Sequence, residues 1–380
     1  AALLSDYFVK NIKKNADGAI TNVICNSAKQ GLIPQRNYFD KDIANSDNTD
    51  GYYIIETNDF VYNPRKSTDA PYGPISCYKY PEAGIVSPLY LCFRAKQEIN
   101  PLYFEWYFRS SVWHRYIYMS GDSGARHDRV SIKDDTFFAM PINIPSAKEQ
   151  DRIALFLNAI EQRIDKQRSL VEALKKYKRG LLNKVFSNIN GNIYPTVYLS
   201  EVADFLQGLT YSPSDVSVSG YLVLRSSNIQ NGVLSFDDCV YVDKKVDKSL
   251  QVKCDDVIMC VRNGSKKLVG KTALIPNNMA MTTWGAFMMI IRSKLNDTYI
   301  FHYLNSQMFF SQVFKDTGTA TINQITKGIL NECKLPLPPE TARKQISKML
   351  SSFDVKIQNA EMCLTTLVEL KKALLQQLFI

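Results

Sequence analysis

Histidine, cysteine and long apolar runs are scarce in this chain of 380 residues. It holds three histidines and eight cysteines, and no two cysteines stand in a CxxC arrangement. A zinc ribbon or a disulfide scaffold is therefore not expected. No run of about 18 apolar residues offers a membrane span, so we expect no membrane partner. The first residues lack a basic segment followed by an apolar core, which predicts no signal peptide and a reducing cytoplasm as the compartment.

The overall composition is that of a globular protein with a basic bias. Apolar residues make up 45% and charged residues 22% of the chain, which excludes a mainly disordered protein. Lys and Arg total 46 against 37 Asp and Glu, for a formal net charge of +9. That balance favours a polyanionic partner. The length predicts two or three domains.

The chain contains an internal repeat. Residues 144–186 match residues 337–379 at a constant shift, with Pro145 matching Pro338 and Phe186 matching Phe379. Further identities in the same register include Leu157 with Leu350 and Lys178 with Lys371. Because the register holds without gaps, we interpret the two stretches as copies of one unit.

Both copies carry apolar residues at steps of three and four, or at multiples of seven. This heptad pattern over about five repeats is the signature of a coiled coil. A helix of that length must bury its apolar seam, and the other copy is the economical partner. The alternative is that each helix packs separately on its own globular domain. The expected seam residues are Ile153, Leu157, Ile160, Ile164, Val171, Leu174, Leu181, Ile346, Leu350, Phe353, Ile357, Leu364, Leu367 and Leu374.

The segments around the helices are rich in β-branched and aromatic residues, with frequent Gly, Pro, Asn and Asp. They echo one another: Asp59–Tyr62 resembles Asp256–Met259, and each is soon followed by an arginine. An aromatic helix is expected in each, at 103–118 and 299–314. The predicted fold class is α+β: two mixed α/β domains joined by two long antiparallel coiled-coil helices, related by a pseudo-twofold internal repeat.

We predict four segments with a linker near the middle of the chain. They are a first domain at 1–140, a strand and spacer helix at 141–187, a linker and second domain at 188–334, and a second strand and spacer helix at 335–380. The linker is expected at 187–192, where Ser, Asn and Gly dominate.

Taken together, these features resemble the specificity subunit of type I restriction–modification systems. The resemblance covers the whole chain. It is most specific at Leu224–Gly232, at Arg262-Asn263-Gly264-Ser265, at Leu268–Ile275, at the proline-rich strand Leu335–Pro339 and at the Leu-Leu-x-x-x-Phe helix ends. The first domain departs from these motifs, since Asn63-Pro64-Arg65-Lys66 stands where Arg-Asn-Gly-Ser would be.

The resemblance implies a non-catalytic DNA-recognition subunit. Each globular block would be a target recognition domain that reads half of a bipartite site in double-stranded DNA. The paired helices would set the spacing of the half-sites and dock two copies of a methyltransferase (modification) subunit, and motor–nuclease (restriction) subunits would join them. No cofactor is expected in this chain, and S-adenosylmethionine is expected in the modification subunit.

Polar loops supply the candidate DNA contacts. Arginine pairs with guanine in the major groove, while Asn and Gln pair with adenine. The residues are Gln35, Arg36, Asn63, Arg65, Lys66, Ser67, Arg126, His127, Arg129, Arg225, Ser227, Asn228, Arg262, Asn263, Ser265, Lys266, Lys267, Thr321, Asn323 and Gln324. The alternative is that these are ordinary exposed turns, with Asn228 bonding the backbone.

Other functions fit the sequence less well. Five residues separate Gly264 from Gly270, where a phosphate-binding P-loop needs four, and the flanking residues predict a strand hairpin. Asn63-Pro64 lacks the second proline and the aromatic residue of the amino-methyltransferase motif. Two alternatives stay open: a fused methyltransferase–endonuclease with its own activity, and a coiled-coil adaptor that binds only proteins.

Overall fold

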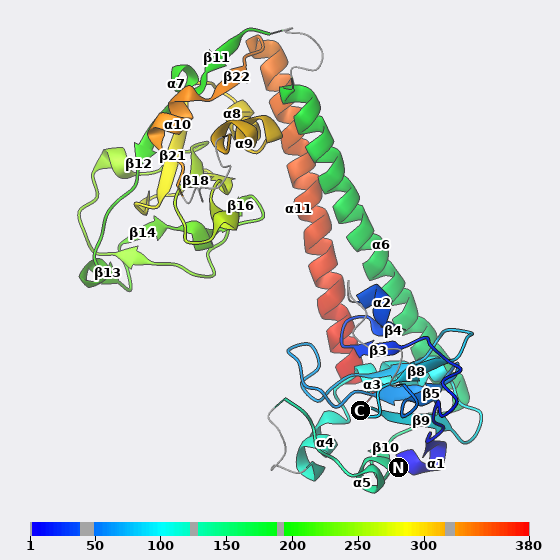
Figure 1. The fold of residues 1–380 in the computed structure, drawn as a ribbon. Coiled ribbons are helices and arrows are strands. Elements are labelled where there is room, and N and C mark those ends of the chain that lie inside the picture. Colours follow the sequence, from blue (N-terminus) through cyan, green and yellow to red (C-terminus); the bar gives the residue numbers. More distant parts are fainter. Residues whose placement is uncertain (1, 39–48, 122–127, 188–193, 316–323, 380) are drawn as a thin grey trace. The chain divides into compact units, whose positions relative to one another are not determined.

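The computed structural model describes residues 2–38, 49–121, 128–187, 194–315 and 324–379. The chain divides into two units, residues 1–168 with 363–380 and residues 169–362. Each unit holds one globular domain and parts of two long helices, α6 (Ala147–Phe186) and α11 (Glu340–Gln377) (Figure 1). Most of the expected linker lies outside the described residues.

Unit 1 is built on a four-stranded antiparallel sheet in the order β2-β9-β6-β7. Two-stranded pairs β3–β4, β5–β8 and β1–β10 add to it. Its elements are β1 (Ala2–Leu3), α1 (Leu4–Tyr7), β2 (Phe8–Lys10), β3 (Ile24–Ser27), β4 (Gly31–Pro34), α2 (Gln35–Tyr38), β5 (Tyr53–Ile55), β6 (Phe60–Tyr62), β7 (Ile75–Cys77), β8 (Gly84–Val86), β9 (Leu91–Ala95), α3 (Pro101–Arg109), α4 (His114–Ser120), α5 (Asp134–Phe138) and β10 (Pro141–Ile142).

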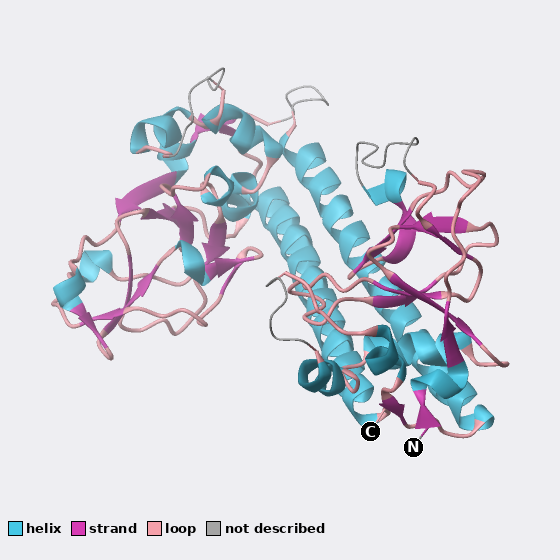
Figure 2. Cartoon of the chain, turned by 60° about the horizontal axis from the view of Figure 1, so that its bottom comes forward, coloured by secondary structure: helices cyan, strands magenta, loops and turns pink. Residues whose placement is uncertain are grey.

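Unit 2 repeats this plan with the antiparallel sheet β12-β21-β18-β19. A second sheet, β13-β17-β14-β20, contains the parallel pair β14–β20. The elements are β11 (Thr196–Tyr198), α7 (Leu199–Val202), β12 (Ala203–Gln207), β13 (Val216–Ser217), β14 (Tyr221–Leu224), β15 (Ile229–Gln230), β16 (Val233–Leu234), β17 (Tyr241–Val242), β18 (Val257–Cys260), β19 (Thr272–Leu274), β20 (Thr282–Trp284), β21 (Met288–Ser293), α8 (Tyr299–Leu304), α9 (Gln307–Val313), α10 (Lys327–Glu332) and β22 (Lys334–Pro336). Figure 2 shows strands and helices mixed in both domains, so the α+β prediction is confirmed.

An arginine paired with a buried aspartate marks the same place in both domains. In unit 1, Arg94 on β9 contacts Asp59 before β6, with Nε–Oδ1 and Nη2–Oδ2 distances of 2.6 and 2.7 Å. In unit 2, Arg292 on β21 contacts Asp256 before β18 at 2.8 and 2.7 Å. Both carboxylates are almost inaccessible to solvent. A two-point contact of this kind fixes geometry as well as charge, so it anchors the central strands.

Each expected aromatic helix is broken in two, which corrects the prediction of one continuous helix. The breaks fall between α3 and α4 and between α8 and α9. Ser110 and Ser306 stand at the two breaks, and each hydroxyl donates to a carbonyl three residues earlier at 2.6 Å. Ser306 also accepts from the Phe309 N–H as the N-cap of α9. Serine side chains compete with helical hydrogen bonding in this way.

In each unit, the phenylalanine at the C-terminal end of a long helix packs against tyrosines of the first aromatic helix. In unit 1, the Phe379 ring lies 5.5 Å from Tyr103 and 5.9 Å from Tyr107. In unit 2, Phe186 lies 5.1 Å from Tyr299 and 5.7 Å from Tyr303. All six of these aromatic residues are buried, so they belong to the domain cores. The repeated Phe therefore fixes each helix end to a domain core.

The long helices are antiparallel in both units. In unit 2, Lys178 pairs with Asp354, and Lys175 Nζ lies 2.8 Å from Glu361 Oε1. In unit 1, Lys371 Nζ lies 2.7 Å from Glu161 Oε2. The residue number of the contact on α6 decreases from Lys178 to Lys175 while that on α11 increases from Asp354 to Glu361. The two helices therefore run in opposite directions, which confirms the prediction. All fourteen expected seam residues are buried or half-buried. In the described part of the chain, no helix has the length and apolar character that a bilayer crossing needs.

Candidate nucleic-acid interface

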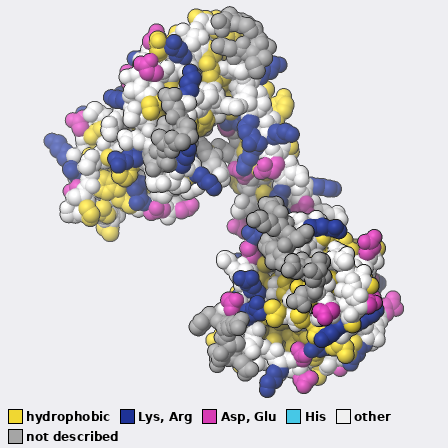
Figure 3. All heavy atoms as spheres, in the orientation of Figure 1, with side chains coloured by type: hydrophobic (Ala, Val, Ile, Leu, Met, Phe, Trp, Pro, Cys, Tyr) yellow, Lys and Arg dark blue, Asp and Glu magenta, His cyan; other side chains and the backbone are white. Residues whose placement is uncertain are grey.

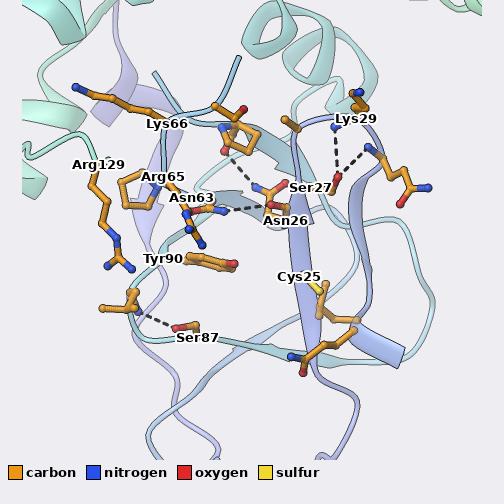
Figure 4. Close-up of a pocket in the computed structure, with 18 of the residues that line it drawn as sticks. Cys25, Asn26, Ser27, Lys29, Asn63, Arg65, Lys66, Ser87, Tyr90 and Arg129 are labelled. Atoms are coloured by element: carbon orange, nitrogen blue, oxygen red, sulfur yellow. Dashed lines mark hydrogen bonds between the residues drawn. The ribbon is translucent and has the colours of Figure 1, made fainter. Parts of the chain in front are cut away.

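Unit 1 contains a cleft of about 790 Å³ that is lined by several of the predicted contact residues. It lies between the β3–β4 hairpin, the loop that follows β6 and the turn that precedes β9 (Figure 4). Lys29, Arg65, Lys66 and Arg129 supply four cationic side chains to its lining, against the single carboxylate of Asp69. Asp69 itself lies 3.5 Å from Lys29 Nζ. The cleft is therefore electropositive and suits an anionic partner.

The floor of this cleft is held by an asparagine network. Asn26 is buried; its amide group donates to Val61 O at 2.7 Å, and its Oδ1 accepts from Ser76 Oγ at 2.7 Å. Asn63 donates to Asn26 O at 3.1 Å, and its Oδ1 accepts from the Arg65 N–H. Burial raises the pKa of Tyr90, so its hydroxyl stays protonated in the cleft. Asn63 thus serves as a support that orients Arg65.

Arg65 and Arg129 face one another across an antiparallel bridge. Flanking hydrogen bonds fix this bridge, with Lys66 N donating to Asp128 O at 2.9 Å and Val130 N to Pro64 O at 2.8 Å. Directly opposed residues of an antiparallel pair point their side chains to the same face. The bridge therefore presents two guanidinium groups side by side.

Unit 2 has the same bridge with a different pair of side chains. Arg262 opposes Gln324, and Ile325 N donates to Val261 O at 2.7 Å. This corrects one alignment made from sequence, because the bridge places Arg65, not Asn63, at the position of Arg262. The loop after Arg262 lies in the β18–β19 hairpin, as predicted, and a short 3-10 turn spans Lys266–Leu268.

The turn at 225–228 lies against this loop, and its side chains are largely occupied. Asn263 donates to Ser226 Oγ at 3.2 Å, which joins the two segments. Arg225 Nη2 lies 2.8 Å from Asp238 Oδ1. Asn228 is fully buried; it accepts from the Arg225 N–H and donates to the carbonyls of Ser235 and Asp238. The predicted base contact of Asn228 is therefore replaced by the structural role, because no part of its amide is accessible.

The remaining predicted residues are distributed over both units. Gln35 and Ser67 also line the unit 1 cleft, whereas Arg36 is exposed outside its lining. Ser265, Lys266 and Lys267 are exposed in unit 2, and Ser227 is half-buried. Arg126, His127, Thr321 and Asn323 lie outside the described residues.

Sequence reasoning missed the residues at the turn before the central strand. Leu89 and Tyr90 line the unit 1 cleft, and Phe287 holds the corresponding place in unit 2. The sequence analysis assigned these residues no role. The available signal was position, since both sit at the start of the repeated strand that leads to Arg94 and Arg292.

The visible charge pattern does not form one continuous basic surface. Figure 3 shows Lys and Arg interspersed with Asp and Glu on the displayed face of each unit. Among the described residues, no group of three His, Cys, Asp or Glu side chains is arranged to hold a metal ion. The side chains at the two bridges, Arg65 with Arg129 and Arg262 with Gln324, can donate hydrogen bonds, and the arginines add positive charge.

Comparison with known proteins agrees with this arrangement. The family model of the type I restriction modification DNA specificity domain matches residues 194–367. The chain is 26% identical over 188 residues to the type I restriction enzyme StySPI specificity subunit of Salmonella potsdam, covering 47% of this chain and 40% of that protein. The chain thus matches well under half the length of this relative.

Solved structures show the same fold over the whole chain. A structure described as the basis of complex assembly and conformational transition of the type I R-M system matches with a TM-score of 0.61 and 17% identity, covering 100% of this chain and 96% of that one. The S subunit of a type I restriction–modification system from M. genitalium matches with a TM-score of 0.58 and 14% identity, covering 100% and 95%. These matches show that the whole chain shares the fold of these solved structures and that residues 194–367 match the type I restriction modification DNA specificity domain.

Proposed function

We propose that this chain is the DNA sequence-specificity subunit of a type I restriction–modification enzyme. The observation that carries the proposal is the duplicated bridge, which presents Arg65 with Arg129 in one domain and Arg262 with Gln324 in the other. One backbone frame thus holds two different sets of base-reading side chains. Each domain would read one half of a bipartite target in double-stranded DNA.

A methylation map of the assembled enzyme tests this assignment. We expect Arg65→Ala to relax base preference in one half-site and Arg262→Ala to relax it in the other half-site. Each variant is the matched control for the other, because both remove an exposed arginine from the same backbone position. Identical changes in both half-sites, or none in either, would contradict the assignment of one half-site to each domain.

The helix pair supports the docking of two modification subunits. Exposed apolar residues recur at equivalent positions of the repeat, with Phe156 matching Met349 and Tyr177 matching Leu370. Phe156 and Leu370 belong to unit 1, and Met349 and Tyr177 belong to unit 2. Each unit therefore offers two exposed apolar side chains at positions that match those of the other unit, and we call these its docking residues.

Co-purification with the modification subunit tests this stoichiometry. Phe156→Asp with Leu370→Asp should leave one bound modification subunit, and the same change at Met349 and Tyr177 should also leave one. The four-site variant should bind none. Retention of two subunits by the four-site variant would exclude these docking residues as the contact sites.

In this proposal the chain positions DNA and the modification subunit carries S-adenosylmethionine and methylates. The purified chain alone, incubated with DNA and S-adenosylmethionine, should transfer no methyl group. A salt titration of DNA binding separates this function from that of a protein-only adaptor. Affinity should fall steeply with salt because phosphate contacts release counterions.

A further inference from the structure

A β-bulge in unit 2 sets the direction of Arg262. The N–H groups of Val261 and Arg262 both donate to Phe287 O, at 3.0 and 3.1 Å. Two residues on one strand thus oppose one on its neighbour, which is the hydrogen-bond pattern of a bulge. Bulges commonly redirect a side chain next to a functional site. In unit 1, Pro64 stands at the place of Val261 and has no N–H to donate, so this pattern cannot form there.

The bulge brings a cation and an aromatic ring together at the surface. The Arg262 guanidinium carbon lies 5.3 Å from the centroid of the Phe287 ring, within the range of a cation–π contact. The Phe287 side chain is 60% exposed. The guanidinium makes no hydrogen bond or ion pair with any other side chain in the described part of unit 2, in contrast to Arg225, which pairs with Asp238. The ring therefore orients Arg262 and leaves its donors available to a ligand.

We propose that Arg262 and Phe287 together read a guanine and a neighbouring thymine, called the TG step whichever base comes first, in the half-site bound by unit 2. This deepens the proposed function and rests on it. Arginine donates two hydrogen bonds to O6 and N7 of guanine, and phenylalanine makes apolar contact with the thymine methyl group. The separation of 5.3 Å is of the size needed to reach neighbouring bases, which are spaced by about 3.4 Å.

Unit 1 carries a weaker version of the same pair. Leu89, 58% exposed, stands where unit 2 has Phe287, and Arg65 stands where unit 2 has Arg262. Leucine has no π face to orient a guanidinium, and the bulge is missing. The TG reader therefore belongs to unit 2 alone, and the two half-sites differ for a physical reason.

The test uses the complete chain assembled with its modification subunits, on duplexes that carry the mapped target. Deoxyuridine replaces the thymine of the TG step, which removes only the methyl group. We expect the affinity of the unaltered protein to fall about fourfold, the effect of removing one methyl-sized apolar contact. Phe287→Ala should bind the two duplexes equally. Because Phe287 is mostly exposed, this variant is expected to fold normally.

Tyr198→Ala is the matched control. Tyr198 is a half-exposed aromatic residue on β11 with Lys334 Nζ 4.7 Å from its ring centroid, so it carries a cation–π contact in the same unit. This variant should keep the fourfold preference for thymine.

Three results would overturn the inference while leaving the proposed function intact. These are a unit 2 half-site without a TG step, a thymine preference that persists in Phe287→Ala, and a complete loss of specific binding in that variant. Failure of the proposed function has a different signature, because the assembled enzyme would then show no site-specific binding at all.

Discussion

Protonation of one buried histidine should make unit 2 lose stability as the pH falls. His302 on α8 is fully buried. Its Nε2 lies 3.1 Å from Ser351 Oγ, and its Nδ1 has no hydrogen-bond partner among the described residues. Asp354 Oδ2 lies 3.8 Å from Nδ1, and Lys178 pairs with that same carboxylate. Burial, together with the charge of Lys178, lowers the pKa of His302 to about 3.

The sign and size of the effect follow from this pKa. The histidine has an ordinary pKa of about 6.5 in the unfolded chain. Below that pH the unfolded state therefore binds a proton at His302 that the folded state does not bind. The free energy of unfolding therefore falls as the pH drops from about 6.5 towards 3. Between pH 7.5 and 5.5 the loss from this group is about 1.4 kcal/mol. Burial raises the pKa of Asp354, which works in the opposite direction and offsets part of the loss.

Urea denaturation at the two pH values measures the effect. His302→Gln removes the titration, so the unaltered protein should lose about 1.4 kcal/mol more than the variant between pH 7.5 and 5.5. His114→Gln in unit 1 is the comparison variant. Burial also lowers the pKa of His114, but that residue is only half-buried, so its effect should be smaller. Equal pH dependence in the unaltered protein and His302→Gln would refute the reasoning.

Three further predictions concern the helices and the domain anchors. The side chains of Lys178 and Asp354 are only 14% and 27% exposed. Lys178→Asp or Asp354→Lys alone should therefore lower the unfolding free energy by about 2 kcal/mol, and the double swap should recover most of this loss. Additive losses in a double-mutant cycle would argue against a direct pair. Asp256→Ala should cost about 3 kcal/mol by leaving Arg292 without its carboxylate, whereas Asp59→Ala should cost less, because Arg94 is 40% exposed and also pairs with Glu56 at 2.9 Å. Thermal denaturation checks both variants, and a loss below about 0.5 kcal/mol for Asp256→Ala would exclude the anchoring role. Deleting residues 167–173 and 360–366 removes one heptad, about 10 Å, from each helix and should shorten the gap between half-sites by about three base pairs in a methylation map; an unchanged gap would show that the helices do not set the spacing.

The sequence was most informative where a pattern repeats. The heptad positions required only the spacing of apolar residues, and each of them is buried or half-buried. The match between Asp59 and Asp256 identified equivalent positions in the two domains, although it did not predict their pairing with Arg94 and Arg292. The direction of the helices followed from the repeat itself, because a pseudo-twofold axis places two copies in opposite directions.

Tertiary contacts decided the features that the sequence did not reveal. A polar side chain in a loop can serve a ligand or its own backbone, and composition does not distinguish the two. Asn228 donates hydrogen bonds to the carbonyls of Ser235 and Asp238, and Arg225 forms an ion pair with the carboxylate of Asp238. Asp238 lies ten or more residues further along the chain than either of them. The bulge at Val261 depends on Phe287, a residue in the turn before β21. Pairings across that distance leave no periodic signal.

The two copies of the repeat differ in a way that separates scaffold from recognition. Positions that hold buried contacts are equivalent in both, as in the arginine–aspartate anchors and the lysine–carboxylate pairs between the helices. The more accessible positions on the same frame have diverged: Arg129 in unit 1 corresponds to Gln324 in unit 2, and Leu89 corresponds to Phe287. Stability constrains a buried charge pair, because losing one partner leaves the other uncompensated. No such cost restricts an exposed side chain, so under the proposed function a duplicated reader can change its target at these positions without altering the frame that presents them.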